Sequence, residues 1–397
     1  MTPVALTSDA LPSVKRAKST WLFSRNVDLG VFVGSALLAG AAIAIGALAG
    51  VLDGDTPSWA WVPAIVLCDV AHVWSTAFRT YLDPVERRAR PTLLVMVPLL
   101  GLAAGIALHA FGHLVFWRTL AYLAIFHFVR QQYGWVSLYR ARAGETDRAT
   151  KIVDTAAIYA ATLYPLLHWH THLPRRFSLF VPGDIVGLGS ASIVMPIATA
   201  LYVAAMSAYV VRSLVAWKRG RGNPGKDVVV ATTAAAWFTG IVVFDSDYAF
   251  TVTNVIMHGV PYFALVYVHS RRATATLAAR ASTAPAPARP SVAARLTRNV
   301  VVFLGALWLV AFVEEMLWDR AVWHDRSWLF GDAWELPPAI HLVVVPLLAL
   351  PQLVHYVLDG FIWRRRSNPS VARLVETTPA SAATASRDAL DVETMAA

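Results

Sequence analysis

Residues 91–110 read PTLLVMVPLLGLAAGIALHA and contain no Asp, Glu, Lys or Arg. As an α-helix rising about 1.5 Å per residue, this stretch would be about 30 Å long, which matches the hydrocarbon core of a bilayer. Similar apolar runs recur along the 397-residue chain, in which 57% of the residues are hydrophobic and 15% are charged. Ordinary soluble domains carry about 25% charged residues. The sequence therefore predicts an all-α, multi-pass transmembrane helical bundle.

Working outward from this run, we predict about ten spans with both termini in the cytoplasm. The spans are 30–52, 58–81, 91–110, 115–138, 153–172, 189–216, 228–248, 250–269, 299–318 and 338–363. With this arrangement, 28 of the 34 Lys and Arg residues lie on the cytoplasmic side and five on the other, as is usual in membrane proteins. The Ala- and Arg-rich composition suits a bacterial plasma membrane, with membrane lipid as the immediate partner.

The connections between spans divide the chain into five predicted parts. A cytoplasmic segment precedes an eight-span part, and an Ala/Pro/Arg linker leads to a two-span part. A polar tail follows, which we expect to be disordered. These parts are residues 1–29, 30–270, 271–298, 299–363 and 364–397.

Four spans carry polar residues at spacings of three or four, which places them along one face of each helix. Each face includes one histidine, about 13–20 Å from the nearest cytoplasmic boundary at 1.5 Å per residue. Because ionisable groups are costly in hydrocarbon, we expect these faces to meet inside the bundle. The faces are Asp69, His72, Thr76 and Arg79; His127, Arg130, Gln131 and Gly134; Thr251, Asn254, His258 and Tyr262; and Gln352, His355 and Asp359.

A metal site is one interpretation of these faces, because neutral imidazole is a good ligand for Fe, Cu, Zn and Ni. The predicted ligands are His72, His127, His258 and His355. Asp69 and Asp359 would be further ligands, or acceptors that orient an imidazole. A proton or ion pathway and simple interhelical hydrogen bonding are the alternative interpretations.

The predicted catalytic residues are Arg130, Gln131 and Asn254. Arg130 is the one Arg well inside a span, and we expect it to pair with Asp69, with Asp359 or with an anionic group of a substrate. Together with Gln131, it would hold a polar end of that substrate.

A second group of histidines falls on the non-cytoplasmic side: His109, His113, His168, His170 and His172, with His324 and His341 nearby. His109 and His113 have the i, i+4 spacing of a ligand pair, but a turn is expected between them at Phe111-Gly112. Histidines at helix ends are common, so this group is the weaker metal candidate. The acidic residues on this side, Glu314 and Glu315 included, are expected to be solvated.

Several other chemistries lack support in the sequence. The single cysteine, Cys68, excludes an intrachain disulfide and an all-protein iron–sulfur cluster. The chain lacks the glycine-rich dinucleotide and phosphate motifs, the Gly-x-Ser-x-Gly elbow and His-Glu-x-x-His. It also lacks a nucleic-acid-binding module, so the net charge of +9 is explained by the cytoplasmic loops.

A polytopic protein with histidines on several spans resembles the histidine-rich membrane non-haem iron oxygenases, in particular the bacterial carotene-cleaving dioxygenases. The resemblance rests on the polar faces of the second, fourth, eighth and tenth spans. It implies an all-helical bundle, iron as the cofactor and oxidation of a lipophilic small molecule. Fatty-acid desaturases look different, because they carry repeated histidine boxes at the cytoplasmic face.

We therefore predict a metal-dependent oxidoreductase or oxygenase that acts on a lipophilic substrate at an intramembrane histidine site. A proton- or ion-coupled transporter is the first alternative, because the same faces could line a path for ions. A b-type haem protein with two axial histidines is the second.

Overall fold

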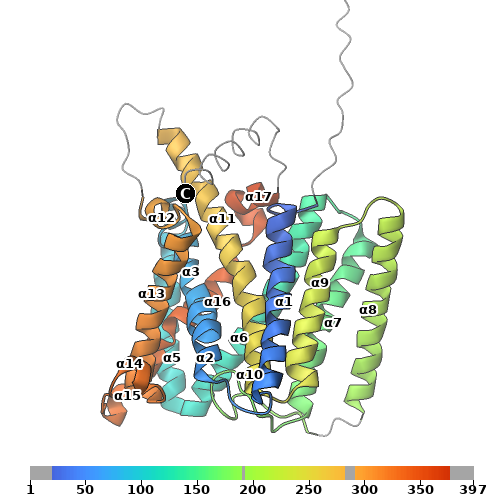
Figure 1. Ribbon diagram of the computed structural model, residues 1–397. Coiled ribbons are helices and arrows are strands. Elements are labelled where there is room, and N and C mark those ends of the chain that lie inside the picture. Colours follow the sequence, from blue (N-terminus) through green and yellow to red (C-terminus); the bar gives the residue numbers. More distant parts are fainter. Residues whose placement is uncertain (1–19, 190–192, 282–290, 376–397) are drawn as a thin grey trace, which may run out of the picture.

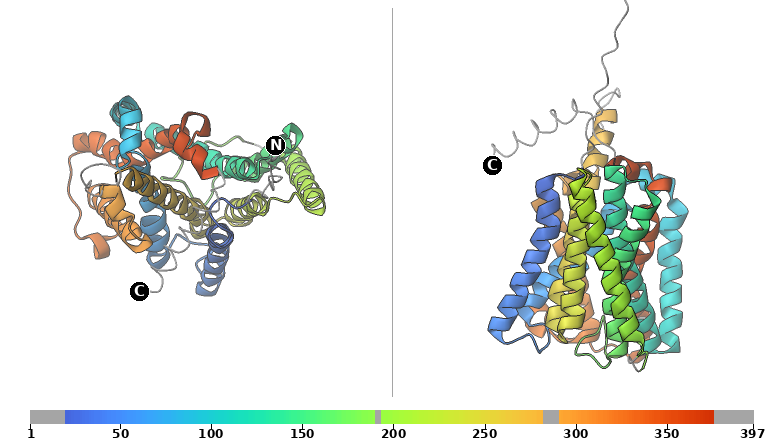
Figure 2. Two further views of the ribbon diagram at one scale, coloured as in Figure 1. Left: turned by 90° about the horizontal axis from the view of Figure 1, so that it is seen from above. Right: turned by 90° about the vertical axis from the view of Figure 1, so that its right-hand side faces the viewer.

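The computed structural model describes residues 20–189, 193–281 and 291–375, and these residues form helices without any strand (Figure 1). The long helices run side by side as a bundle, which Figure 2 shows from above and from the side. We call the end where α1 begins and α17 lies the terminal face. The opposite end, which carries residues 50–57, 172–189 and 319–337, is the loop face.

Ten long helical segments account for most of the bundle. They are α1 (Arg25–Ala49); α2, η1 and α3 (Ser58–Trp61, Val62–Val70, Ala71–Arg79); α5 (Pro91–Phe111); α6 (His113–Ala143); α7 (Arg148–Thr171); α8 (Val194–Lys218); α9 and η2 (Pro224–Trp237, Phe238–Val243); α10, η3 and α11 (Asp247–Phe250, Thr251–Val255, Ile256–Ala281); α13 and η4 (Val300–Trp318, Asp319–Trp323); and α15 and α16 (Pro338–Leu348, Leu350–Ile362). The short elements are α4 (Pro84–Ala89), α12 (Val292–Leu296), α14 (Ser327–Phe330), η5 (Arg365–Ser367) and α17 (Pro369–Val375).

Each predicted span coincides with one of the ten long segments. The prediction of an all-helical chain is confirmed, and eight of the segments are long and apolar enough to cross a membrane. The other two, α6 and α7, are long but more polar. The number of ten spans and the cytoplasmic location of both termini stay predictions.

Helix ends follow ordinary capping chemistry. The Ser24 hydroxyl accepts a hydrogen bond from the Val27 amide and begins α1, while Gly50, at φ +70°, ends it. Gly112, at φ +150°, separates α5 from α6. The turn expected between His109 and His113 is therefore present, so these two residues do not share one helix.

Four of the long segments contain π-helical stretches, namely η1, η2, η3 and η4. Such stretches are rare and occur frequently at functional sites. Here η1 contacts η3, and η3 contacts η2. Gly240 in η2 permits the second contact, because a Cβ there would lie 2.0 Å from the Thr253 hydroxyl oxygen.

A buried ion network joins helices near the terminal face. Asp154 on α7 is fully buried, and its carboxylate pairs with Arg140, with Arg212 at 2.9 Å and with Lys226 at 2.9 Å. Glu145 accepts a further hydrogen bond from Lys226 at 2.5 Å. Each buried charge thus has an opposite charge beside it, as burial requires.

The chain differs from the prediction at two connections. Helix α11 continues beyond residue 270 to Ala281, so the first part of the predicted linker is helical, and residues 282–290 lie outside the described residues. The predicted disordered tail begins too early, because α17 buries Val371 and Leu374 against the bundle. These two residues are three apart and give an otherwise polar segment one apolar face. Residues 1–19 and 376–397 of the predicted terminal segments also lie outside the described residues.

Candidate metal centre

Four histidines from four helices meet in the interior of the bundle. His72, His127, His258 and His355 each offer one ring nitrogen, and these four atoms lie within 4.8 Å of one another. All four side chains are buried, with at most 4% of the surface of each exposed. They come from α3, α6, α11 and α16, and α3 contacts both α11 and α16. The expected meeting of the four histidines is therefore present.

The arrangement fits one transition-metal ion. Two imidazole nitrogens on opposite sides of a metal are about 4.2 Å apart, since each bond is about 2.0–2.1 Å long. The widest pair, at up to 4.8 Å, needs to close by about 0.6 Å to reach that separation, or by about 1.4 Å to reach the roughly 3.4 Å of a tetrahedral site. His72 Nε2 and His258 Nε2 are already 3.0 Å apart. Within the described residues, these four histidines are the one group of three or more His, Cys, Asp or Glu side chains whose ligand atoms lie close enough to share a metal ion.

Unpartnered nitrogens also point to a ligand at this position. The Nε2 atoms of His127 and His355 are buried and lack a hydrogen-bond partner. Leaving a buried polar atom unsatisfied costs about 1–3 kcal/mol. A shared metal ion would give both atoms a partner.

A chain of hydrogen bonds fixes the orientation of His355 from the terminal-face side. His355 Nδ1 lies 2.7 Å from the Thr76 hydroxyl, which lies 2.9 Å from the Tyr262 hydroxyl, and Tyr262 donates to Asp359 Oδ1 at 2.6 Å. If each group donates to the next, His355 carries its proton on Nδ1 and Nε2 presents a lone pair to the centre. Trp363 Nε1 also donates to Tyr262, at 3.3 Å.

The two aspartates predicted as possible ligands stand behind the imidazoles. Asp359 Oδ1 is 3.8 Å from His355 Nδ1, and Asp69 Oδ1 is 3.5 Å from His72 Nδ1. These distances exceed a normal hydrogen bond, and both carboxylates lie on the Nδ1 side of their histidine. Their positions favour the orienting role over direct ligation.

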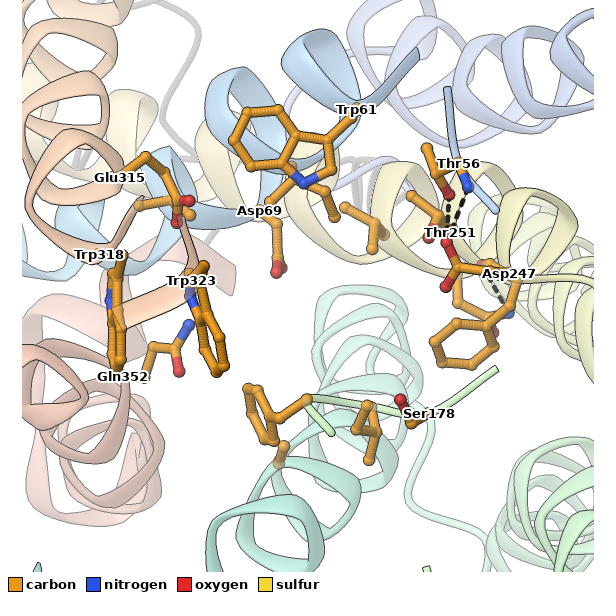
Figure 3. Close-up of a pocket in the computed structure, with 18 of the residues that line it drawn as sticks. Thr56, Trp61, Asp69, Ser178, Asp247, Thr251, Glu315, Trp318, Trp323 and Gln352 are labelled. Atoms are coloured by element: carbon orange, nitrogen blue, oxygen red, sulfur yellow. Dashed lines mark hydrogen bonds between the residues drawn. The ribbon is translucent and has the colours of Figure 1, made fainter. Parts of the chain in front are cut away.

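A cavity of about 430 Å³ opens at the loop face (Figure 3) and ends at residues that pack against the histidines, none of which lines it. Its inner end is formed by direct neighbours of the candidate ligands. The ring of Phe128 lies 4.1 Å from that of His258, and the ring of Tyr356 lies 5.1 Å from that of His127. In Figure 3 the Asp69 carboxylate points into the open centre of the cavity.

The cavity wall combines aromatic rings with carboxylates. Its aromatic residues include Trp61, Trp117, Trp318 and Trp323, and its acidic residues are Asp55, Asp69, Asp247, Glu315 and Asp325. Arg326 is the one cationic side chain of the wall, and its guanidinium lies 3.7 Å over the Trp61 ring. The cavity therefore accepts apolar groups along its sides and has an excess of negative charge.

A second cleft, of about 660 Å³, faces sideways between α1, η1, α11 and α13 and is lined almost entirely by apolar residues. Cys68 and Val260 lie on its wall, and none of the four histidines does. A Cβ on Gly259 would lie 2.7 Å from Cys68 Sγ. Closely packed helices thus separate this cleft from the candidate metal centre.

The three predicted catalytic residues are placed differently from one another. Asn254 lines the cavity, and its Oδ1 atom is buried without a hydrogen-bond partner. Gln131 donates to the His258 carbonyl oxygen at 2.9 Å and so ties α6 to α11. Arg130 is exposed on the outside of α6, donates to the Tyr159 hydroxyl at 2.6 Å and lies over the Tyr133 ring. The expected pairing of Arg130 with Asp69 or Asp359 is therefore wrong.

The pair Glu314 and Glu315 was expected in solvent at the end of a span, and this expectation is wrong. Both are buried, at 5% and 9% exposed. Glu314 accepts a hydrogen bond from Trp74 Nε1, and Glu315 lines the cavity. Hydropathy alone cannot separate these positions, because a residue at a span end can face either water or a cavity.

The histidines of the other group stay apart from the four-histidine centre. The rings of His168 and His172 stack at 3.9 Å, those of His109 and His113 are 6.0 Å apart, and His170 bonds to Tyr122. Among the described residues, these histidines contact one another only in pairs, and they do not form a group of three or more that could share a metal ion. They are explained as ordinary packing near the loop face.

Comparisons with known proteins add no family to this geometry. No family model matches the chain, and neither a curated protein nor a solved structure matches it. Any function must therefore be argued from the four histidines and the cavity beside them.

Proposed function

We propose that this protein is an integral membrane metalloprotein whose four-histidine centre binds iron and oxidises a lipophilic substrate. The observation that carries the proposal is the convergence of four buried imidazoles, from helices far apart in sequence, within 4.8 Å. When bound, a redox-active ion would supply Lewis-acid or electron-transfer chemistry at this point.

The residues of the chain itself would provide position and shielding. Thr76 and Tyr262 hold His355 in one orientation, and Gln131 holds the backbone of His258. The aromatic part of the cavity wall, including Phe128 and Tyr356, offers an apolar surface to a substrate beside the histidines. Such a surface limits the access of water to the reacting groups.

The haem alternative is less favoured by this arrangement. A haem with two axial histidines needs a flat macrocycle between its two nitrogens, and the other two histidines occupy that space here. The transporter alternative has one specific observation in its favour. The cavity between the loop face and the neighbours of the histidines carries five carboxylates, a lining that attracts cations.

Elemental analysis of detergent-purified protein, prepared without chelators, tests the proposal. We expect about one iron per chain, and strong loss of iron in single His→Ala variants at positions 72, 127, 258 and 355. His170→Ala is the matched control, because His170 lies outside the centre and bonds to Tyr122. Folded wild-type protein without metal would contradict the metal site. Stoichiometric zinc would keep the site and contradict the oxidoreductase.

Turnover separates the enzyme from the transporter. An oxidoreductase in nanodiscs should consume O₂ when a substrate and a reductant are supplied. A transporter should move the ion across the membrane of a sealed proteoliposome without consuming O₂.

A further inference from the structure

The cavity beside the histidines has features of a binding site that the proposed oxidation does not use. Asn254 is 4% exposed and its Oδ1 atom has no hydrogen-bond partner. The side chain of Glu315, 9% exposed, lines the cavity and makes neither a hydrogen bond nor an ion pair within the described residues. Asp69 is 26% exposed at its side chain and points into the same space (Figure 3). Three oxygen-bearing side chains thus line the same cavity and are left to interact with whatever enters it.

Oxygen ligands and excess negative charge select for cations. Carboxylate and amide oxygens are typical ligands of hydrated divalent ions. The cavity wall carries five carboxylates and one cation, Arg326, which is also close to Asp325, at 3.8 Å. A cleft lined by one sign of charge concentrates ions of the opposite sign and accelerates their binding.

The other directions of approach are closed. On the terminal-face side, the hydrogen-bonded chain of Thr76, Tyr262 and Asp359 packs directly against His355. On the lipid side, the wall is apolar, and Gly259 and Cys68 are in close contact. A hydrated ion would lose its water without compensation along the apolar path, and the groups on the terminal-face side are already bonded to one another.

We propose that this cavity is the loading route of the metal centre. A divalent cation enters at the loop face, is held by Asp69, Asn254 and Glu315, and exchanges its water for the imidazoles. Asp69 is suited to the transfer, because its carboxylate borders the cavity and lies 3.5 Å from His72 Nδ1. The inference rests on the proposed metal site. Its test measures the rate at which the ion arrives separately from the amount of ion that is finally bound.

The first experiment blocks the cavity. Cys68 is the one cysteine of the chain, so Cys68→Ala gives a background for single-site labelling. Ser178 stands across the cavity from Asp69 in Figure 3 and is partly exposed. Ser178→Cys in this background, labelled with a bulky methanethiosulfonate, should take up Co²⁺ much more slowly than the unlabelled protein in stopped-flow absorption. Its final Co²⁺ content should be unchanged.

Ser367→Cys, exposed at the terminal face, is the matched control and should load at the same rate with and without the label. If labelled Ser178→Cys loads as fast as the unlabelled protein, or if both labels slow loading equally, the proposed route is overturned. If the wild type binds no Co²⁺ at all, the metal site itself fails, and the route falls with it.

The second experiment removes charge from the wall. Glu315→Gln should lower the Co²⁺ association rate by about tenfold at low salt and weaken its dependence on ionic strength. Glu335→Gln removes an exposed acid from the same face that does not line the cavity, and it should leave the rate unchanged. Equal rates in the Glu315 variant and the wild type would contradict the role given to this carboxylate.

Discussion

Gly259 lies against Cys68 so closely that a Cβ at position 259 would be 2.7 Å from Cys68 Sγ and 3.2 Å from the Cys68 carbonyl oxygen. Each residue is close in sequence to a candidate ligand, Gly259 to His258 and Cys68 to His72. The absence of a side chain at 259 therefore sets the distance between α11 and η1 and, with it, the 3.0 Å between the two Nε2 atoms.

Gly259→Ala should separate these two helices and weaken metal binding by about tenfold or more, because a misplaced ligand loses its bond. Overpacking of this kind also costs about 1–3 kcal/mol of stability. Metal titration and thermal unfolding in detergent measure the two effects. Gly134→Ala is the control, because nothing lies within 4 Å of a Cβ there. Equal metal affinity in both variants would contradict the packing argument.

Thr76→Val should reduce metal affinity by about 10–100-fold, the usual effect of losing a group that orients a ligand. Valine keeps the shape of threonine but breaks the link between His355 and Tyr262. Thr232→Val serves as the comparison, since Thr232 bonds only to backbone carbonyls of its own helix. Metal titration of both variants measures this effect. A normal metal affinity in Thr76→Val would show that Thr76 does not help to orient His355 for metal binding.

Asp154→Asn should destabilise the protein by about 3–5 kcal/mol, because it leaves buried cations without their partner. Its metal content, once folded, should be unchanged, because the ion network does not contact the histidines. Asp53→Asn removes one partner of the exposed ion pair with Arg176 and should cost at most about 1 kcal/mol. Thermal unfolding compares the two, and similar midpoints would show that the buried network adds little stability.

A chain that ends after Asn368 should be less stable than one that ends after Val375. The shorter chain loses Val371 and Leu374, whose burial contributes about 3–6 kcal/mol together. Membrane accumulation and thermal unfolding of the two truncations measure the difference. If they behave alike, α17 is not part of the stable bundle.

Reporter fusions test the topology that charge asymmetry predicts. Fusions after residues 25, 110, 222 and 397 should report inside, outside, inside and inside. An outside signal at 222 would mean that the spans before it are miscounted.

Sequence reasoning worked best where one physical constraint acts alone. Hydropathy located the long segments because a bilayer demands uninterrupted apolar helices. The histidines at 72, 127, 258 and 355 were found because ionisable groups on such helices must turn inward. Three predicted polar faces are present, on η1 and α3, on η3 and α11, and on α16. Along each, a residue that lines the cavity is followed by a histidine and then by a residue of the hydrogen-bonded chain.

The prediction from sequence was wrong for Arg130, because the angular position of a side chain around its helix decides which neighbouring helix it contacts. At about 100° per residue, Arg130 is rotated by about 60° from His127 on one side and Gln131 by about 40° on the other. Gln131 therefore still reaches α11, whereas Arg130 reaches Tyr159 on α7. The π-helical stretches and the position of Ser178 across the cavity from Asp69 depend on tertiary packing, for which a local pattern gives no signal.

The order of the four histidines along the chain has a consequence for biogenesis. Three of them belong to the first eight long segments, and His355 belongs to the last. Helices enter the bilayer one after another as the ribosome makes them, so a nascent chain presents three imidazoles until its final hairpin has been inserted. If the proposed metal site is correct, a centre with all four imidazoles would form only after the segment that carries His355 has been made, and a bound ion would distinguish such chains from ones truncated before it.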